Sequence, residues 1–356
     1  MPWGGIVEGV PPRMRSHVRT IFVLALVAGL LGLFLYNVDL WRVVTEIFRA
    51  RPQWLALSLV TMLANLAIRA WRWQFLLEPL GRPTFGGAFR ATAVGFAATS
   101  VLPARAGEVI RPYFLARTER HDERMTATGA FATIILERVL DTITVLILLA
   151  SFVFVFGREH RASSPVAFTA VQWAGAIAGL GAAVALGLLF VLAGDPGRLG
   201  RVMLRLEQVL PSTLAGLIAR LAEKFARGLG AIRRPSRLLV SLLLSVPLWL
   251  SICLGTWSVT MAFGFDIPFT GSFLLVAVLV LGVAVPTPGA VGGFHEAFRV
   301  ATTVFFAVPD DSAVAAAIVL HLFSIGPVLL LGLMFAAQAG LNVNGLRRIA
   351  DQGHTA

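Results

Sequence analysis

Charged residues are scarce in this 356-residue chain, because Asp, Glu, Lys and Arg make up only 14% of it. Soluble domains carry about 25% charged residues, so this composition excludes an ordinary water-soluble fold. Cysteine is nearly absent, since Cys253 is the only one. A single cysteine excludes a disulfide framework and a cysteine-based metal site, and we expect Cys253 to be a small core residue. Lysine is equally rare: Lys224 stands alone, and arginine carries the basic charge.

Apolar residues dominate instead. The chain is 57% hydrophobic with a mean hydropathy of +0.81, and apolar runs recur at the roughly 20-residue length that crosses a bilayer as a helix. The runs are continuous, not alternating, which excludes a β-barrel reading. The sequence therefore predicts an all-α polytopic membrane protein with a single membrane domain, 1–356. About six full transmembrane helices are expected, near residues 20–37, 53–76, 127–156, 168–193, 238–263 and 311–338.

Two further apolar stretches, at 85–117 and 270–306, are interrupted. The first contains SVLPARAGEVIRP (Ser100 to Pro112) and the second VPTPGAVGGFHE (Val285 to Glu296). Proline and glycine stop helical pairing, and irregular backbone at membrane depth survives only inside protein or against a water-filled cavity. Both stretches are thus predicted to be broken, re-entrant helical elements. The residues expected to form the breaks are Pro103, Gly107, Pro286, Pro288, Gly289, Gly292 and Gly293.

The distribution of charge supports the re-entrant topology. The net charge is +11, and the 194–237 loop holds nine basic residues against three acidic ones. If both broken elements return to the side from which they enter, this loop and both termini share the cytoplasmic side, as the positive-inside rule requires. If both cross, the most basic loop lies outside. The positive charge then faces an anionic cytoplasmic leaflet, not nucleic acid, and an amphipathic helix in the 194–237 loop is expected to lie on that leaflet.

The re-entrant topology also predicts an inverted repeat. In it the second broken element enters from the opposite face to the first, which is the arrangement that an inverted repeat produces. Chance resemblance between two Pro/Gly breaks is the alternative. The expected location is a bacterial-type cytoplasmic (inner) membrane, crossed several times, with cytoplasmic N- and C-termini; self-association into a homo-oligomer is left open.

Three charges lie inside the 127–156 run. Glu137 is about 15 Å along the helix from Thr126, near the middle of a bilayer, and Arg138 and Asp141 are close by. Each such charge costs roughly 2.5–3.5 kcal/mol on insertion scales. Arg138 is therefore expected to pair with a carboxylate. The group is either a buried ionic clasp between helices or a polar site for a charged substrate or a proton relay.

Charged and titratable residues elsewhere in the apolar runs have simpler interpretations. Asn65 and Arg69, four apart on one face of the second span, are weaker site candidates. The favoured interpretation of Arg69 and Arg72, beside Trp71 and Trp73, is that they are snorkelling anchors at the membrane interface. His321 lies well inside the last predicted span and is expected to be a core histidine, with a proton carrier as the alternative.

The broken elements bring charges of their own. A helix resuming near Ala106 presents free backbone N–H groups suited to phosphate, and arginine can grip phosphate in a bidentate fashion. Arg105, Arg111 and Arg138 are expected to bind phosphate, while the carboxylates pair with them or accept a cationic group. Capping of local backbone is the alternative role for Glu108 and Glu296. The candidate substrate-binding residues are Arg105, Glu108, Arg111, Glu137, Arg138, Asp141, Glu296 and Arg299.

Four stretches together resemble a known family. RAWRWQFLLEPLG from Arg69, LPARAGEVIRPYFLAR from Leu102, ILERVLD from Ile135 and PTPGAVGGFHEAF from Pro286 resemble the lysylphosphatidylglycerol synthase transmembrane-region family, also called flippase-like integral membrane proteins. The resemblance spans nearly the whole chain. It departs from the usual pattern at Ala290, where a second glycine is common, and at Ala98 or Thr99, where an asparagine often stands.

The resemblance implies a flippase-like transporter. In the bifunctional members a separate soluble domain makes the aminoacylated lipid and the membrane region flips it, so the expectation here is a transporter of membrane lipid and not an enzyme. No cofactor and no metal site are expected. The alternatives are an ion-coupled transporter of a small soluble anion and a non-transporting scaffold for an envelope enzyme. A lateral opening is needed only by a lipid, and a sealed charge network fits only the scaffold.

Overall fold

The computed structural model describes residues 38–102, 105–118, 125–156, 165–194, 212–232, 235–285 and 287–340. Within these ranges every regular element is a helix, so the all-α prediction is confirmed. Five helices are long and apolar enough to cross a membrane: Pro52–Leu77, Ala127–Val155, Pro165–Leu192, Ser236–Ala262 and Asp310–Gln338. The predicted span at 20–37 lies outside the described residues, as do Pro103 and Pro286.

Local sequence signals account for where several helices begin. The hydroxyl of Thr84 accepts from the N–H of Gly87 at 3.0 Å ahead of α4 (Phe85–Val101), and Thr126 caps α6 (Ala127–Ser151) through Gly129 at 3.2 Å. Such side-chain caps satisfy N–H groups that a helix start leaves free. Helix α3 (Pro52–Leu77) opens on a proline, whose fixed φ suits a first helical turn.

The chain contains two four-helix units with the same order of lengths. In the first, α3 is followed by the two short helices α4 and α5 (Gly107–Thr118) and by the long α6. In the second, the long α11 (Pro235–Ala262) is followed by the short α12 (Gly271–Ala284) and α13 (Gly293–Phe306) and by the long α14 (Asp310–Gln338). Helix α3 packs along its counterpart α11, and α4 contacts α14 as its counterpart α12 contacts α6, so the contacts between the two units are symmetric. This arrangement fits the predicted repeat.

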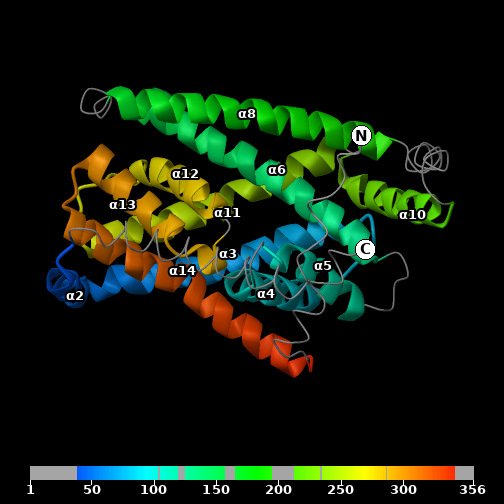
Figure 1. The fold of residues 1–356 in the computed structure, drawn as a ribbon, viewed down its shortest axis with the longest axis horizontal. Coiled ribbons are helices and arrows are strands. Elements are labelled where there is room, and N and C mark those ends of the chain that lie inside the picture. Colours follow the sequence, from blue (N-terminus) through cyan, green and yellow to red (C-terminus); the bar gives the residue numbers. More distant parts are fainter. Residues whose placement is uncertain are drawn as a thin grey trace, which may run out of the picture.

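Each pair of short helices forms a tight hairpin at a glycine crossing. A Cβ on Gly107 would overlap the carbonyl oxygen of Gly95, and Gly282 and Gly293 meet in the same way in the second unit. The hairpin of α4 and α5 lies in the right half of Figure 1, and that of α12 and α13 in the left half. Between them the first break contacts the end of α12, where Arg105 donates from Nη2 to the carbonyl oxygen of Val283 at 2.9 Å, and the 3₁₀ turn of the second break, Pro288–Ala290, contacts α4.

The hairpin crossing gives a stability prediction. We expect Gly107→Ala to lower the free energy of unfolding by about 1–3 kcal/mol, because the added methyl group forces α4 and α5 apart. The matched control is Gly181→Ala in α8 (Pro165–Gly194), where a Cβ meets nothing within 4 Å. That change should be neutral or stabilising by up to about 1 kcal/mol. Thermal unfolding in detergent, followed by tryptophan fluorescence, measures both; equal midpoints for the two variants would contradict the role of the crossing.

Two peripheral helices complete the described fold. Helix α8 lies along α6 at the edge of the molecule and is largely exposed, with Ile177 and Leu180 each 70% accessible, as expected of a lipid-facing helix (Figure 1). Helix α10 (Ser212–Gly228) packs against α6, is followed by a 3₁₀ turn at Leu229–Ala231, and lies within the predicted 194–237 loop. Helix α2 (Leu40–Arg49) precedes α3 and packs against α14.

Candidate functional site

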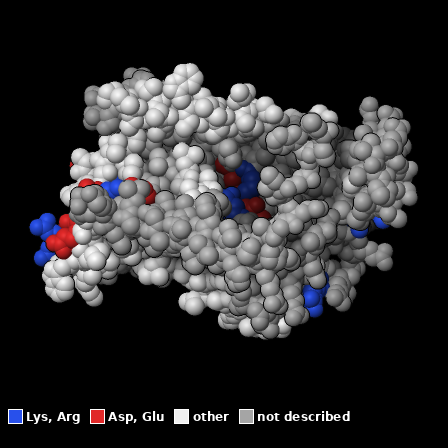
Figure 2. Space-filling view, in the orientation of Figure 1, with Lys and Arg blue, Asp and Glu red and all other residues white. Residues whose placement is uncertain are grey.

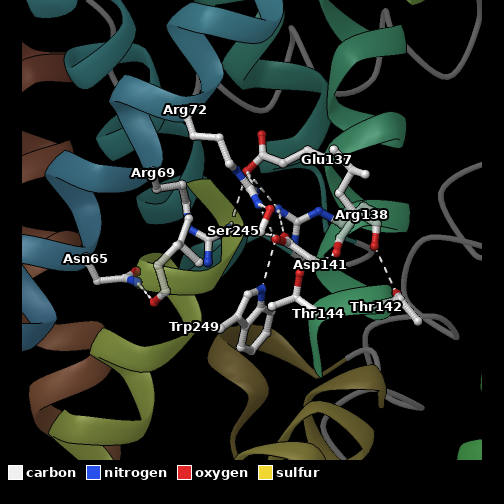
Figure 3. Close-up of polar contacts among 12 residues, drawn as sticks. Asn65, Arg69, Arg72, Glu137, Arg138, Asp141, Thr142, Thr144, Ser245 and Trp249 are labelled. Carbon is white, nitrogen blue, oxygen red and sulfur yellow. Dashed lines mark hydrogen bonds and ion pairs between the residues drawn. The ribbon is translucent and has the colours of Figure 1, made fainter. Parts of the chain in front are cut away.

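A group of six charged side chains is enclosed by α3, α5 and α6. We call this group the ion cluster, and it comprises Arg69, Arg72, Arg111, Glu137, Arg138 and Asp141. Five of the six are less than a tenth exposed, and the Arg138 side chain is 38% exposed. Glu137 and Asp141 lie one helical turn apart on α6, and Arg69 and Arg72 lie three apart on α3, so each pair shares a helix face. Figure 3 shows the two pairs pointing toward each other.

Glu137 is the centre of this cluster. It is completely buried, and its carboxylate lies 3.3 Å from Arg69, 3.0 Å from Arg72, 3.1 Å from Arg111 and 3.4 Å from Arg138. One carboxylate thus contacts four guanidinium groups contributed by three helices. In a low-dielectric interior such a group is strongly coupled to each of its neighbours.

Asp141 ties the cluster to α11. Its Oδ1 accepts from Arg72 at 2.6 Å and from the indole N–H of Trp249 at 3.0 Å (Figure 3). Arg72 also donates to the hydroxyl of Ser245 at 2.6 Å. The pairing expected for Arg138 is present, since it lies 3.4 Å from Glu137 and 3.5 Å from Asp141.

The charges of the ion cluster do not cancel. Four arginines minus two carboxylates leave a net charge of +2. Several guanidinium N–H groups also lack a hydrogen-bond acceptor among the described residues: Nε and Nη2 of Arg111 and Nε of Arg138 are buried without one. Buried polar groups normally have partners, and an uncompensated buried charge is costly. The cluster is therefore suited to receive an anion with several acceptor oxygens.

A cavity of about 130 Å³ opens beside these free donors. Its lining includes Arg111 and Arg138 from the cluster together with Arg105, Gly107 and Glu108 from the first break. Arg111 is held at the edge of the cavity, where the central carbon of its guanidinium lies 3.8 Å from the centre of the Trp73 ring. The Trp73 indole in turn donates to Thr133 at 2.9 Å. Figure 2 shows acidic and basic side chains at the bottom of a hollow in the middle of one face.

The backbone at the first break adds to this cavity. Helix α5 begins at Gly107, and Gly107 and Glu108 line the cavity, so the start of the helix faces the free guanidinium donors. Arg105 adopts a left-handed φ of 53°, a conformation that costs a non-glycine residue about 1–2 kcal/mol. Its side chain is held by α12 through the carbonyl of Val283. The first break therefore combines a helix start, a strained residue and a cation at one cavity wall.

A second cavity, of about 110 Å³, lies on the other side of Phe96. Phe96 lines both cavities, and the guanidinium of Arg69 lies 5.3 Å from its ring. Asn65 and Ser324 also line the second cavity, and the Asn65 amide donates to the carbonyl oxygen of Leu248 at 2.9 Å. Arg69 thus links the ion cluster to a second hollow between α3, α4 and α14.

The prediction for Arg69 and Arg72 was wrong. They are not interfacial anchors, because Arg72 is fully buried and Arg69 is 6% exposed. Trp73 is buried too, whereas Trp71 is 54% exposed. The signal that could have found the arginines was the shared face with Asn65, four residues before Arg69. Two unpaired carboxylates on another span also needed cations, and these arginines supply them.

Two predicted site residues belong neither to the ion cluster nor to the lining of its cavity. Glu296 and Arg299 pair with each other at 2.7 Å, and Arg299 also contacts Asp310 at 2.9 Å. All three are partly exposed, and neither Glu296 nor Arg299 lines the cavity at the first break. Glu296 lies in the first turn of α13, but the side chain that caps this helix is His295, whose Nδ1 accepts from the N–H of Gly292 at 3.3 Å. The second break therefore differs chemically from the first.

The second break holds a histidine pair instead of an ion cluster. The rings of His295 and His321 lie 4.3 Å apart, and Nε2 of His321 is 2.8 Å from the carbonyl oxygen of Gly289. Gly289, Ala290 and Gly292 all have positive φ angles, of 61°, 56° and 86°. The left-handed conformation at Ala290 explains why glycine suits this position in related sequences. In the described residues, no group of three or more His, Cys, Asp or Glu side chains could hold a metal ion.

Comparison with known proteins agrees with this architecture. The profile of the family described as "Lysylphosphatidylglycerol synthase TM region" matches residues 20–332. A UPF0104 membrane protein of Methanocaldococcus jannaschii is 25% identical over 128 residues, which cover 35% of this chain and 34% of that protein. The chain thus aligns with about a third of the length of that curated relative.

Proposed function

The chain belongs to the lysylphosphatidylglycerol synthase transmembrane-region family, and on that basis we propose that it moves a lipid with an anionic, phosphate-bearing headgroup between membrane leaflets. The observation that carries the proposal is the buried excess of guanidinium groups beside a cavity. Phosphate supplies the several acceptor oxygens that the free N–H groups of Arg111 and Arg138 lack. Transport, not catalysis, is the proposed activity.

The proposed mechanism uses the ion cluster as an exchangeable network. With the site empty, Glu137 and Asp141 compensate half of the arginine charge. An entering phosphate takes the unoccupied donors of Arg111 and Arg138 and brings the cluster closer to neutrality. Glu108, which lines the same cavity, is placed to accept an amino group on an aminoacylated headgroup. Differential pairing of this kind stabilises the headgroup at a depth where water is scarce.

The proposed topology follows the charge distribution. We propose that the hairpins α4–α5 and α12–α13 are re-entrant from opposite faces of a bacterial-type inner membrane, with both termini and α10 on the cytoplasmic side. Two features support it: the glycine crossings that fold each hairpin back on itself, and the contact of the first break with the end of α12 at Arg105 and Val283. The sequence contains no Walker motif, so the proposed transport is downhill or coupled to an ion.

Vesicle reconstitution tests this function. We expect the purified protein to expose fluorescent phosphatidylglycerol from the inner leaflet to an external quencher, and Arg138→Ala to slow this exchange about ten- to a hundredfold. Glu108→Ala should slow the exchange of the lysyl ester of the same lipid by a similar factor, because its amino group loses its carboxylate partner. The matched control is Arg237→Ala, which removes a salt bridge to Glu78 at 2.9 Å. Both residues of that pair lie outside the cavity lining, so the control should exchange lipid at the wild-type rate.

The same vesicles separate the alternatives. Uptake of radiolabelled inorganic phosphate without lipid exchange would replace the proposal with a transporter of soluble anions. Absence of both activities from well-folded wild-type protein would favour a scaffold. Wild-type exchange of phosphatidylglycerol by Arg138→Ala and of its lysyl ester by Glu108→Ala would show that the site is misassigned.

A further inference from the structure

An apolar groove lies further along α6 than the cationic cavity. The cavity takes Ile134 and Arg138 from α6, and the groove takes Thr142, Leu146 and Leu149 from the same helix. These positions are three or four residues apart, so they form one stripe along one face. The hydroxyl of Thr142 donates to the carbonyl oxygen of Arg138 at 2.9 Å, so this donor is satisfied without a water molecule in the groove.

Helix α12 forms the opposite wall of both hollows. Val283 lines the cavity, and Leu281, Val278 and Ala277 line the groove one after another. The cavity and the groove are therefore successive sections of one seam between α6 and α12. Arginine side chains line the section of the seam before Thr142, and aliphatic side chains line the section beyond it.

Helix α8 supplies the third wall with small residues. Ala174, Gly175 and Ala178 face the groove, and a Cβ on Gly175 would lie 3.4 Å from Leu149. The remainder of α8 is largely exposed, which places the groove at the edge of the bundle, where lipid has access. From Arg138 to Leu149 the helix rises about 16 Å, close to the roughly 15 Å thickness of one hydrocarbon leaflet.

We infer that this groove binds an acyl chain of the same lipid whose phosphate occupies the cationic cavity. The inference rests on the proposed function and deepens it, because it makes the substrate an amphiphile held at both ends. The position of the groove indicates its occupant, because a cationic section suited to phosphate is followed along α6 by an aliphatic section about one leaflet long. A soluble anion would use the first section and leave the second without a role.

Photocrosslinking with a matched pair of variants tests the inference. The probe is phosphatidylglycerol carrying a diazirine in one acyl chain, added to the full-length protein in vesicles and followed by peptide mass spectrometry. We expect labelling of the 142–149 segment, reduced about tenfold or more by Ala178→Phe, because each displaced methylene weakens binding about fourfold. Ala178→Leu should have a smaller effect in the same direction. Ala176→Phe, at an exposed position of α8, should label like the wild type.

The headgroup dependence of labelling completes the test. A diazirine-labelled diacylglycerol with the same chains lacks phosphate and should label the groove no more than it labels other lipid-facing surfaces. If Ala178→Phe keeps wild-type labelling of 142–149 while remaining folded, or if phosphatidylglycerol and diacylglycerol label it equally, the groove is not the chain site. Lipid exchange that needs Arg138 but survives Ala178→Phe would reject this inference and leave the proposed function intact.

Discussion

Glu137→Gln is expected to leave the protein largely unfolded or poorly accumulated in the membrane. The substitution removes the one carboxylate that contacts four arginines and raises the net charge of the ion cluster from +2 to +3. Removing one partner from a buried ion network typically costs about 3–5 kcal/mol, because the remaining charges stay buried without compensation. Thermal unfolding in detergent and the monodisperse fraction on gel filtration measure the loss.

Two further variants distinguish the effect of the lost buried charge from the effect of replacing a glutamate by glutamine. Glu296→Gln removes a carboxylate whose partner, Arg299, is partly exposed, and it should cost no more than about 1 kcal/mol. The double variant Arg69→Gln/Glu137→Gln returns the cluster to +2 and should recover much of the lost stability. If Glu137→Gln unfolds at the wild-type midpoint, the ion cluster does not hold α3 and α6 together.

Arg111→Gln is expected to slow lipid exchange about ten- to a hundredfold while leaving the fold in place. Charge-assisted hydrogen bonds contribute about 1.5–3 kcal/mol each, and Arg111 offers two buried N–H groups that have no acceptor among the described residues. Glu137 keeps its other three arginine partners in this variant. The unfolding midpoint should therefore move much less than it does for Glu137→Gln.

The contact between Arg111 and Trp73 suggests a further variant for testing the phosphate contact. The Arg111 guanidinium lies over the Trp73 ring, 3.8 Å from its centre, and a lysine keeps the charge but not the planar fork. Arg111→Lys should thus exchange lipid more slowly than the wild type, whereas Arg237→Gln should be normal. A purely structural role for Arg111 would predict loss of exchange only in proportion to loss of folded protein, and that result would contradict the proposed phosphate contact.

The sequence left open whether the charges of the 127–156 run form a structural clasp between helices or a site for a substrate, and the contacts of the ion cluster address this question. Glu137 and Asp141 bind α3 and α6 together, as a clasp would. The four arginines exceed what two carboxylates need, and the excess faces a cavity, which a clasp does not require. The two predictions test the two roles separately: Glu137→Gln tests the clasp through protein stability, and Arg111→Gln tests the substrate site through lipid transport.

The amino-acid sequence by itself determined the class of protein and the positions of its unusual residues. Scarce charge and continuous apolar runs leave helices as the way to satisfy backbone hydrogen bonds in lipid, and five such helices lie within the described residues. The two breaks and the charged Glu137, Arg138 and Asp141 inside an apolar run were also visible, because hydropathy and helix-breaking residues are local properties of the chain.

Only the tertiary structure decided which charges meet. Arg69 and Arg72 have the sequence pattern of interfacial anchors, yet the packing of α3 against α6 places them on Glu137 and Asp141. Glu296 follows its break much as Glu108 does, yet its partner is Arg299 on its own helix. Whether a charge can be buried depends on the groups within a few ångströms of it, and those come from helices far apart in the chain.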